Sequence, residues 1–289
     1  MPSVFLEHYE TSTDAVLSRL GVKFVEVKDF NCCGYPLKNS NFKAYLLSSA
    51  RNLALAEKND SNILTFCNDC YLSTKHVNQL MKEDAATGAE INKTLEKEGL
   101  KYEGNVEVRH LLDVLYHDVG VEQIKEKMTK TFDGLKLAVH YGCHILRPRQ
   151  LVQFNDPGTA PIFDQLVDIT GAERVAWSTQ GECCASPIWG INDDLSLELT
   201  GKKLAEAKES GAEYLCVACP FCQLQFDRVQ RLGLAKGNGD NRLPSLIFTQ
   251  LLGLSLGVDQ TALGIQKNEL DASGIMNFLS QKPVSQPSE

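Results

Sequence analysis

The sequence has no long apolar run and no cluster of basic residues. Its 289 residues carry a formal net charge of −8, and no uninterrupted apolar stretch approaches the roughly 20 residues that a membrane-spanning helix needs. Nothing in it offers the row of cations that neutralises nucleic-acid phosphates. A Gly-x-Gly-x-x-Gly loop for a flavin or dinucleotide is also missing. We therefore expect no nucleic-acid partner, and any redox chemistry would need electrons from another protein.

The first residues show no basic segment followed by an apolar stretch, so no export signal is expected. We predict a cytoplasmic protein that reaches a membrane only through its partners. In that reducing compartment disulfides are disfavoured, yet the chain holds ten cysteines. Metal ligands or reactive thiols are the remaining interpretations.

Eight of the cysteines form a duplicated pattern, in which an adjacent pair is followed by a Cys-x-x-Cys. The first copy consists of Cys32, Cys33, Cys67 and Cys70, and the second of Cys183, Cys184, Cys219 and Cys222. The intervening segments, residues 34–66 and 185–218, are 33 and 34 residues long. Vicinal cysteines seldom close a strain-free disulfide, whereas these spacings can bring several sulfurs to one point.

The flanks of the two copies also repeat. Helices are expected over 15–20, 45–58, 163–167 and 195–210, and strands over 22–27, 62–66, 174–177 and 214–217. Alternating strands and helices indicate parallel sheets with sites beyond the carboxyl ends of the strands. We predict an α/β fold of two pseudo-symmetric, Rossmann-like βαβ domains whose cysteine edges face a shared cleft. The predicted domains are 1–130 and 131–258, followed by an extension, 259–289, whose Pro/Ser-rich end beyond 281 is disordered.

A ninth cysteine, Cys143, follows a hydrophobic strand over 137–141. If residues 3–6 form the matching strand of the first half, Glu7 or His8 lies near the position that Cys143 occupies in the second half. The second half therefore offers five sulfurs and the first half four.

Four thiolates can hold a [4Fe–4S] cluster, a [2Fe–2S] cluster or a structural zinc ion. A zinc ribbon typically uses two Cys-x-x-Cys knuckles, but each half here has one knuckle and one vicinal pair. That arrangement favours iron–sulfur over zinc. A fifth cysteine suggests a bridging ligand in a less usual cluster, or an inert neighbour.

The duplicated series of a cysteine, a Cys-Cys pair and a Cys-x-x-Cys resembles the CCG domains of the B-type subunits of heterodisulfide reductases. Stretches over 108–112, 139–144, 219–227 and 249–254 are similar to that family as well. The resemblance covers residues 3–258. It implies that a noncubane [4Fe–4S] cluster is bound by five cysteines, namely Cys143, Cys183, Cys184, Cys219 and Cys222.

In that family two such clusters face each other and cleave a disulfide, with electrons from a C-type subunit that carries cubane [4Fe–4S] clusters. A flavin-bearing A-type subunit is a further expected partner. The resemblance predicts an oxidoreductase subunit acting on a disulfide, thiol or sulfur-carrier substrate. The catalytic residues it implies are Cys143, Cys184, Cys219 and His144. The alternative is a non-catalytic electron relay in a quinone- or fumarate-linked reductase.

This sequence departs from the family in its first half, which lacks the upstream cysteine. Its four cysteines are therefore predicted to hold a [4Fe–4S] or [2Fe–2S] cluster, with zinc less favoured and His8 as a candidate substitute. The second pair is followed by Ala185 where the family has glycine. We interpret Cys216 as a buried free thiol, and His140 as a core residue or a group that tunes the cluster.

Overall fold

The computed structural model describes residues 6–155, 161–236 and 242–282, which form two compact units that interleave along the chain. The larger unit contains residues 6–23, 115–142, 161–236 and 242–282, and the smaller contains 24–114 and 143–155. These units run across the boundaries predicted at residues 130 and 258. The N-terminal helix α2 (Glu7–Leu20) packs on α13 (Phe248–Ser255) within the larger unit, where Ser12 Oγ and Thr249 Oγ1 are hydrogen-bonded at 2.6 Å.

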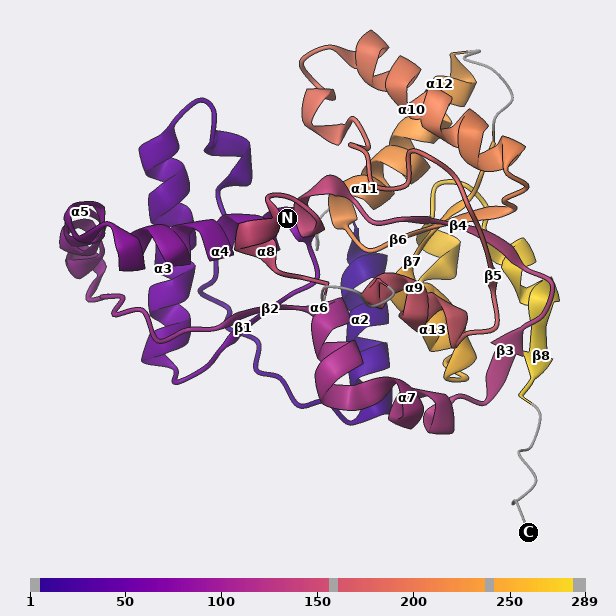
Figure 1. The fold of residues 1–289 in the computed structure, drawn as a ribbon, viewed down its shortest axis with the longest axis horizontal. Coiled ribbons are helices and arrows are strands. Elements are labelled where there is room, and N and C mark those ends of the chain that lie inside the picture. Colours follow the sequence, from indigo (N-terminus) through magenta and orange to yellow (C-terminus); the bar gives the residue numbers. More distant parts are fainter. Residues whose placement is uncertain (1–5, 156–160, 237–241, 283–289) are drawn as a thin grey trace. The chain divides into compact units, whose positions relative to one another are not determined.

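A four-stranded parallel sheet with the strand order β5-β4-β6-β7 forms the centre of the larger unit (Figure 1). Its strands are β4 (Lys136–His140), β5 (Glu173–Val175), β6 (Tyr214–Val217) and β7 (Ser245–Ile247). Every residue of β6 and β7 is buried, and so are the last four residues of β4. Strands buried on both faces read as continuous apolar runs, as these do. The mixed α/β fold with parallel sheets is as predicted.

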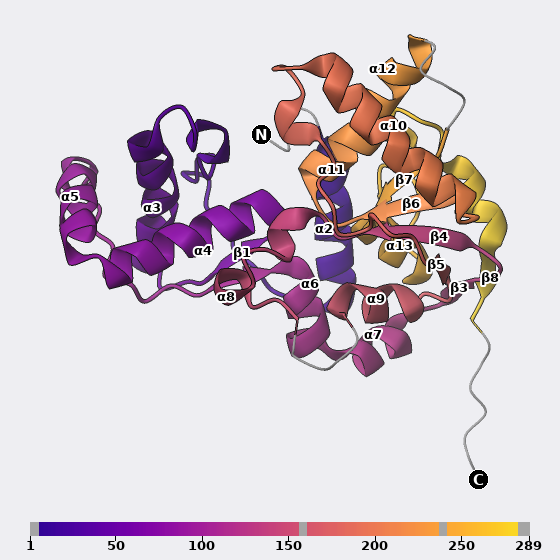
Figure 2. The same ribbon diagram turned by 45° about the horizontal axis from the view of Figure 1, so that its top comes forward.

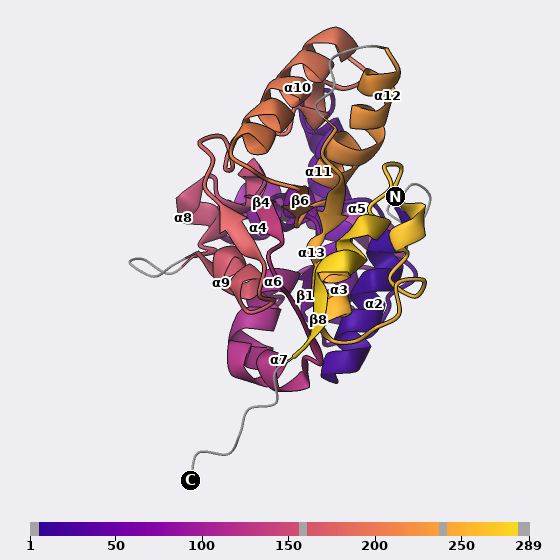
Figure 3. The same ribbon diagram turned by 90° about the vertical axis from the view of Figure 1, so that its right-hand side faces the viewer.

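Helices cover both faces of this sheet. Figures 2 and 3 show α10 (Asp193–Glu209) and α12 (Gln230–Ala235) on one side, with α2, α9 (Ile162–Asp168) and α13 on the other. The remaining helical elements of the unit are η3 (Val114–Gly120), α7 (Val121–Lys127), η5 (Ser186–Ile188), α11 (Pro220–Leu224), η6 (Gln225–Val229), η7 (Ile265–Lys267) and η8 (Ser273–Phe278). Helices α9 and α10 match the predicted segments 163–167 and 195–210.

The C-terminal extension is tied to the larger unit by a short antiparallel pair. Strand β8 (Leu279–Gln281) pairs with β3 (Lys130–Phe132). Further back, the Asp227 carboxylate accepts backbone N–H groups from Glu269 and Leu270, each at 2.8 Å. Of the tail predicted to be disordered, all but Lys282 lies outside the described residues.

The smaller unit contains a parallel pair of strands, β1 (Ile63–Thr65) and β2 (Val108–His110). Its main helices, α3 (Phe42–Lys58), α4 (Asn68–Glu83) and α5 (Ala85–Leu95), pack against one another. Tyr45, Leu53 and Val77, none of them exposed, lie in the apolar core between these helices. The shorter elements are η1 (Tyr35–Leu37), η2 (Glu96–Glu98), α6 (Leu111–Asp113), η4 (Cys143–Ile145) and α8 (Arg149–Val152).

The prediction of a strand over residues 22–27 is wrong, because those residues form no strand. Phe24 is 46% exposed and Val25 80% exposed, so the alternating apolar side chains have no face to pack on. In the second half the matching strand, β5, pairs with β4. The segment that would match β4, residues 3–6, lies outside the described residues except for Leu6.

Candidate metal centres

In the smaller unit the four cysteines of the first copy form a continuous chain of contacts. Cys67 occupies the N-cap position of α4 and Cys70 lies in the first turn of that helix, while Cys32 and Cys33 directly precede the turn into η1. The Cys33 thiol is hydrogen-bonded to Cys32 and Cys70, and Cys70 is also hydrogen-bonded to Cys67. The fold therefore brings the vicinal pair onto the Cys-x-x-Cys, as a shared metal requires.

The larger unit repeats this arrangement with the second copy. The Cys184 thiol is hydrogen-bonded to Cys183 and Cys222, and Cys222 is also hydrogen-bonded to Cys219. Cys219 follows the carboxyl end of β6 and occupies the N-cap position of α11, which places it at the sheet edge where ligands of parallel sheets bind. The order of contacts is the same in both units: first pair member, second pair member, last knuckle cysteine, first knuckle cysteine.

These thiols differ from an isolated cysteine because neighbouring sulfurs shift their pKa values. The Cys183 neighbour and burial raise the pKa of Cys184, and Cys184, Cys219 and burial raise the pKa of Cys222. In the smaller unit the hydrogen bonds from Cys32 and Cys70 lower the pKa of Cys33, while Cys33 raises the pKa of Cys32. Adjacent buried thiols cannot all ionise without a cation, and iron or zinc supplies that charge. The donor set fits a thiolate-bound metal or cluster.

Matched backbone anchors hold the two vicinal pairs. Ser49 Oγ on α3 donates to the Cys33 carbonyl at 2.6 Å. Thr200 Oγ1, at the corresponding place on α10, lies 3.4 Å from the Cys184 carbonyl. A side chain of the following helix, α3 or α10, thus contacts the backbone carbonyl of the second cysteine in each pair.

A second anchor on α10 secures the loop that leads into Cys183. The Glu206 carboxylate accepts from Ser178 N and Oγ, both at 2.6 Å, and from Thr179 N and Oγ1 at 3.2 and 2.7 Å. Hydrogen bonds from Ser178 and Thr179 lower the pKa of Glu206 to about 2. Lys203, one turn earlier, donates to the Thr179 carbonyl.

His140, the last residue of β4, lies beside the cysteines of the larger unit. One of its ring nitrogens and the Sγ atoms of Cys184 and Cys222 all lie within 4.8 Å of one another. Burial lowers the pKa of His140 to about 3, so its ring is neutral. Lys203 is also buried, with Nζ 5.1 Å from the centre of the Trp177 ring.

Cys143 and His144 lie in the smaller unit, in a segment where η4 packs on α4. His144 Nδ1 contacts the carboxylate of Asp69, which is 7% exposed and stands between Cys67 and Cys70. The Tyr35 ring meets the His144 ring edge-on at 5.0 Å. That Cys143 binds the same cluster as the cysteines of the second copy stays a prediction, and so does its catalytic role.

The other two candidates lie in the core of the larger unit. Cys216, on β6, is fully buried and burial raises its pKa, as expected of an inert thiol. His8, 4% exposed on α2, packs against Gly264, where an added Cβ would lie 2.6 Å from the His8 Cβ. Burial lowers the pKa of His8 to about 4. Its predicted substitution for the missing cysteine stays a prediction.

Sequence reasoning missed Asp69, Lys203 and Glu206. A charged residue inside a cysteine knuckle was the signal available for Asp69. Lys203 and Glu206 both fall within the predicted helix 195–210. Nothing in the sequence showed that their side chains contact the loop before Cys183. Only the packed structure shows these contacts.

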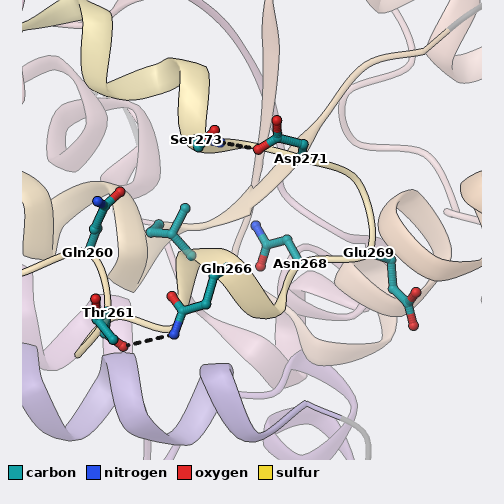
Figure 4. Close-up of a pocket in the computed structure, with 8 residues that line it drawn as sticks. Gln260, Thr261, Gln266, Asn268, Glu269, Asp271 and Ser273 are labelled. Carbon is teal, nitrogen blue, oxygen red and sulfur yellow. Dashed lines mark hydrogen bonds between the residues drawn. The ribbon is translucent and has the colours of Figure 1, made fainter.

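A hollow of about 510 Å³ lies away from the cysteines, between η7 and η8. Seven of the eight residues that line it are polar, and none is a cysteine (Figure 4). Within the described ranges, no helix is long and apolar enough to cross a bilayer.

Comparison with known proteins gives matches over most of the chain. A family model described as a cysteine-rich domain, CCG, matches residues 4–75 and 137–227. The chain is 36% identical over 265 residues to the B-type subunit of the ferredoxin/F420H2-dependent CoB–CoM heterodisulfide reductase of Methanosarcina acetivorans, covering 90% of this chain and 88% of that protein. It is 33% identical over 263 residues to the 8-methylmenaquinol:fumarate reductase membrane anchor subunit of Wolinella succinogenes, covering 91% of each.

A solved structure also matches. The crystal structure of a hypothetical protein from Helicobacter pylori gives a TM-score of 0.72 over 91% of this chain and 49% of that one. The two sequences are 18% identical, so the likeness concerns the fold alone.

Proposed function

Because the chain belongs to the family of cysteine-rich CCG proteins that includes the B-type subunits of heterodisulfide reductases, we propose that it is an iron–sulfur redox subunit that reduces or oxidises a disulfide, thiol or sulfur-carrier substrate. The finding that carries this proposal is the contact chain from Cys183 through Cys184 and Cys222 to Cys219. Four sulfurs meet there at the carboxyl edge of a parallel sheet, beside a buried histidine.

The second copy is the proposed catalytic centre. Its four cysteines would hold a noncubane [4Fe–4S] cluster, with Cys143 as the fifth sulfur. Cys143 stands three residues beyond the end of β4, a strand that neighbours β6, and Cys219 stands two residues beyond the end of β6. Thiolate-bound iron supplies one-electron chemistry and an attachment point for substrate sulfur.

Reduction of a disulfide consumes two electrons and two protons and breaks one S–S bond to give two thiols. The chain holds no flavin or dinucleotide loop, so we assign the electrons to a partner that carries cubane clusters, with a flavin-bearing subunit behind it. We assign His144 as the donor of one proton, and solvent supplies the other. Since Asp69 contacts Nδ1, the imidazole is oriented by a carboxylate, and Nε2 is the nitrogen that would exchange a proton with substrate.

The first copy is assigned a second cluster, of the [4Fe–4S] or [2Fe–2S] type. Its cysteines make the same order of contacts as the second copy, but its own upstream cysteine is missing. We infer that the two halves derive from one βα unit and are pseudo-symmetric. That their cysteine edges face a shared cleft stays a prediction.

A relay without catalysis is the second candidate, supported by the fumarate reductase relative. In that case both clusters would pass electrons between partner subunits and neither would bind sulfur substrate. Both functions require iron, whereas a zinc-stabilised scaffold does not.

Anaerobic purification followed by iron and zinc analysis and EPR tests the proposal. Roughly eight irons per chain would indicate two [4Fe–4S] clusters, and zinc without iron would exclude the proposed redox function. For catalysis, Cys184→Ser and Cys219→Ser should abolish disulfide reductase turnover of the assembled complex, while the control Cys216→Ala keeps it. Full turnover in either serine variant would leave only the relay.

A further inference from the structure

His140 is a fully buried histidine at the carboxyl end of β4, a central strand of the sheet in Figure 1. Its ring meets the Phe226 ring edge-on at 4.8 Å and lies 6.1 Å from the Trp177 ring. Trp177 is itself fixed, because its Nε1 donates to the Val139 carbonyl at 3.1 Å. The aromatic walls therefore leave the imidazole little rotational freedom.

Both ring nitrogens of His140 are buried and lack a hydrogen-bond partner among the described residues. An imidazole carries at least one N–H in every protonation state. Leaving such a buried donor unsatisfied costs about 1–3 kcal/mol. The ring therefore calls for an acceptor that the protein's own oxygen and nitrogen atoms do not supply in the described parts of the chain.

Sulfur is the acceptor that the geometry offers. A ring nitrogen of His140 lies within 4.8 Å of both Cys184 Sγ and Cys222 Sγ, and these two thiols are in contact with each other. Neither nitrogen is hydrogen-bonded to these sulfurs or to any other described atom. A sulfide that binds together with the iron, or a thiolate that shifts as the iron binds, would supply the acceptor.

We propose that His140 donates an N–H hydrogen bond to a sulfur of the cluster held by the second copy, either an inorganic sulfide or a ligating thiolate, and thereby raises the cluster's reduction potential. Hydrogen bonds to cluster sulfurs stabilise the reduced, more negative state. His140 is thus a positioning and tuning residue, not an iron ligand. The inference rests on the proposed function, because it requires iron–sulfur at this site.

Histidine-specific ¹⁵N labelling of the anaerobically purified full chain, read by pulsed EPR, tests the contact directly. The relevant signal is the one that Cys222→Ser abolishes. A weak ¹⁵N coupling is expected in the native protein. It should vanish in His140→Phe and persist in His117→Phe, a control that alters an exposed histidine of the same unit.

Redox titration of the same signal tests the consequence. His140→Phe should shift the midpoint potential to more negative values with iron content unchanged, and His140→Gln, which keeps an N–H donor, should restore part of the shift. No ¹⁵N coupling, a strong coupling typical of nitrogen bound to iron, or an unchanged potential in a folded His140→Phe would each overturn the inference. If that variant does not fold, the coupling in the native protein still decides.

The two proposals fail in different ways. A chain that binds iron and turns over substrate, but shows no coupling to His140, loses only the inference. A chain that binds no iron after anaerobic purification loses the proposed function, and the role of His140 falls with it.

Discussion

Gly34 and Ala185 take the same left-handed backbone conformation, with φ of +83° and +71°. Each directly follows a vicinal cysteine pair, and each leads into a short 3₁₀ turn that begins with a residue before proline. The left-handed region suits glycine and strains a residue with a Cβ. The two copies therefore make the same turn although only one of them has the glycine, so the change to alanine did not alter the path of the backbone.

This equivalence predicts an asymmetric mutational response. In Gly34→Ala the new Cβ would lie 2.8 Å from Ser48 Cβ and 3.0 Å from Tyr45 Cα. Strain and overpacking together should cost roughly 2–4 kcal/mol in the free energy of unfolding. Ala185→Gly relieves strain but loses a buried methyl group and rigidity, so it should change stability by less than about 1 kcal/mol. Anaerobic urea unfolding measures both, and equal costs for the two variants would contradict the shared turn.

The helix and strand that separate each cysteine pair from its Cys-x-x-Cys could be predicted from the sequence. The segments between Cys33 and Cys67 and between Cys184 and Cys219 are long enough for one helix followed by one strand. The structure has α3 and then β1 in the first segment, and α10 and then β6 in the second. Helix periodicity and short apolar strands are local signals, so they could be read residue by residue.

What the sequence could not give depends on partners distant in the chain. Residues 22–27 alternate like a strand, but a strand forms only where a neighbour offers its backbone groups. The packing of α2 on α13, through Ser12 and Thr249, joins segments 237 positions apart. His140 looked like one more histidine beside a cysteine, because neither burial nor an unsatisfied ring nitrogen is visible in a sequence.

The first copy should hold its metal independently of the second. Cys70→Ser removes a sulfur that contacts both Cys33 and Cys67, so we expect loss of the smaller unit's share of the iron. Cys216→Ala, which changes a buried cysteine outside both contact chains, should keep the full complement. Iron per chain and the EPR spectrum of each variant measure this. Native iron content in Cys70→Ser would exclude that cysteine as a ligand.

Asp227 should make stability depend on pH in an unusual direction. Burial raises its pKa from 3.8 to about 6, so the folded chain holds this proton to higher pH than the unfolded chain. The contribution to stability is therefore present below about pH 4 and is lost as pH rises through about 6, by roughly 2–3 kcal/mol. Asp227→Asn should remove this component.

Urea unfolding of the wild type and of Asp227→Asn between pH 4.5 and 7.5 measures the effect of Asp227. The difference in unfolding free energy between the two proteins should change over this range, in favour of the variant as pH rises. A difference that stays constant with pH would show that the Asp227 carboxyl titrates alike in the folded and unfolded chains. The amide of Asp227→Asn has a single acceptor oxygen for the two N–H groups of Glu269 and Leu270, so the variant also loses some stability. The test is therefore how the difference changes with pH, not how large it is.

Glu206 should govern how firmly the second copy holds its iron. Its carboxylate accepts four hydrogen bonds from Ser178 and Thr179, at the start of the loop to Cys183. Glu206→Ala leaves these donors to water and should lower the unfolding free energy by about 1–3 kcal/mol. Because the pKa of Glu206 falls from 4.5 to about 2 on folding, its contribution is full above pH 4.5 and is lost as pH falls through about 2.

The sharper measurement for Glu206 is the rate at which a chelator removes iron from the anaerobic protein. Glu206→Ala should release the iron of the second copy several-fold faster than wild type, because the loop that carries Cys183 is no longer fixed to α10. Glu209→Ala, an exposed position one turn later on the same helix, supplies the matched control and should behave as wild type. Equal release from both variants would mean that the cysteines alone hold the loop, and that the anchor on α10 contributes to folding only.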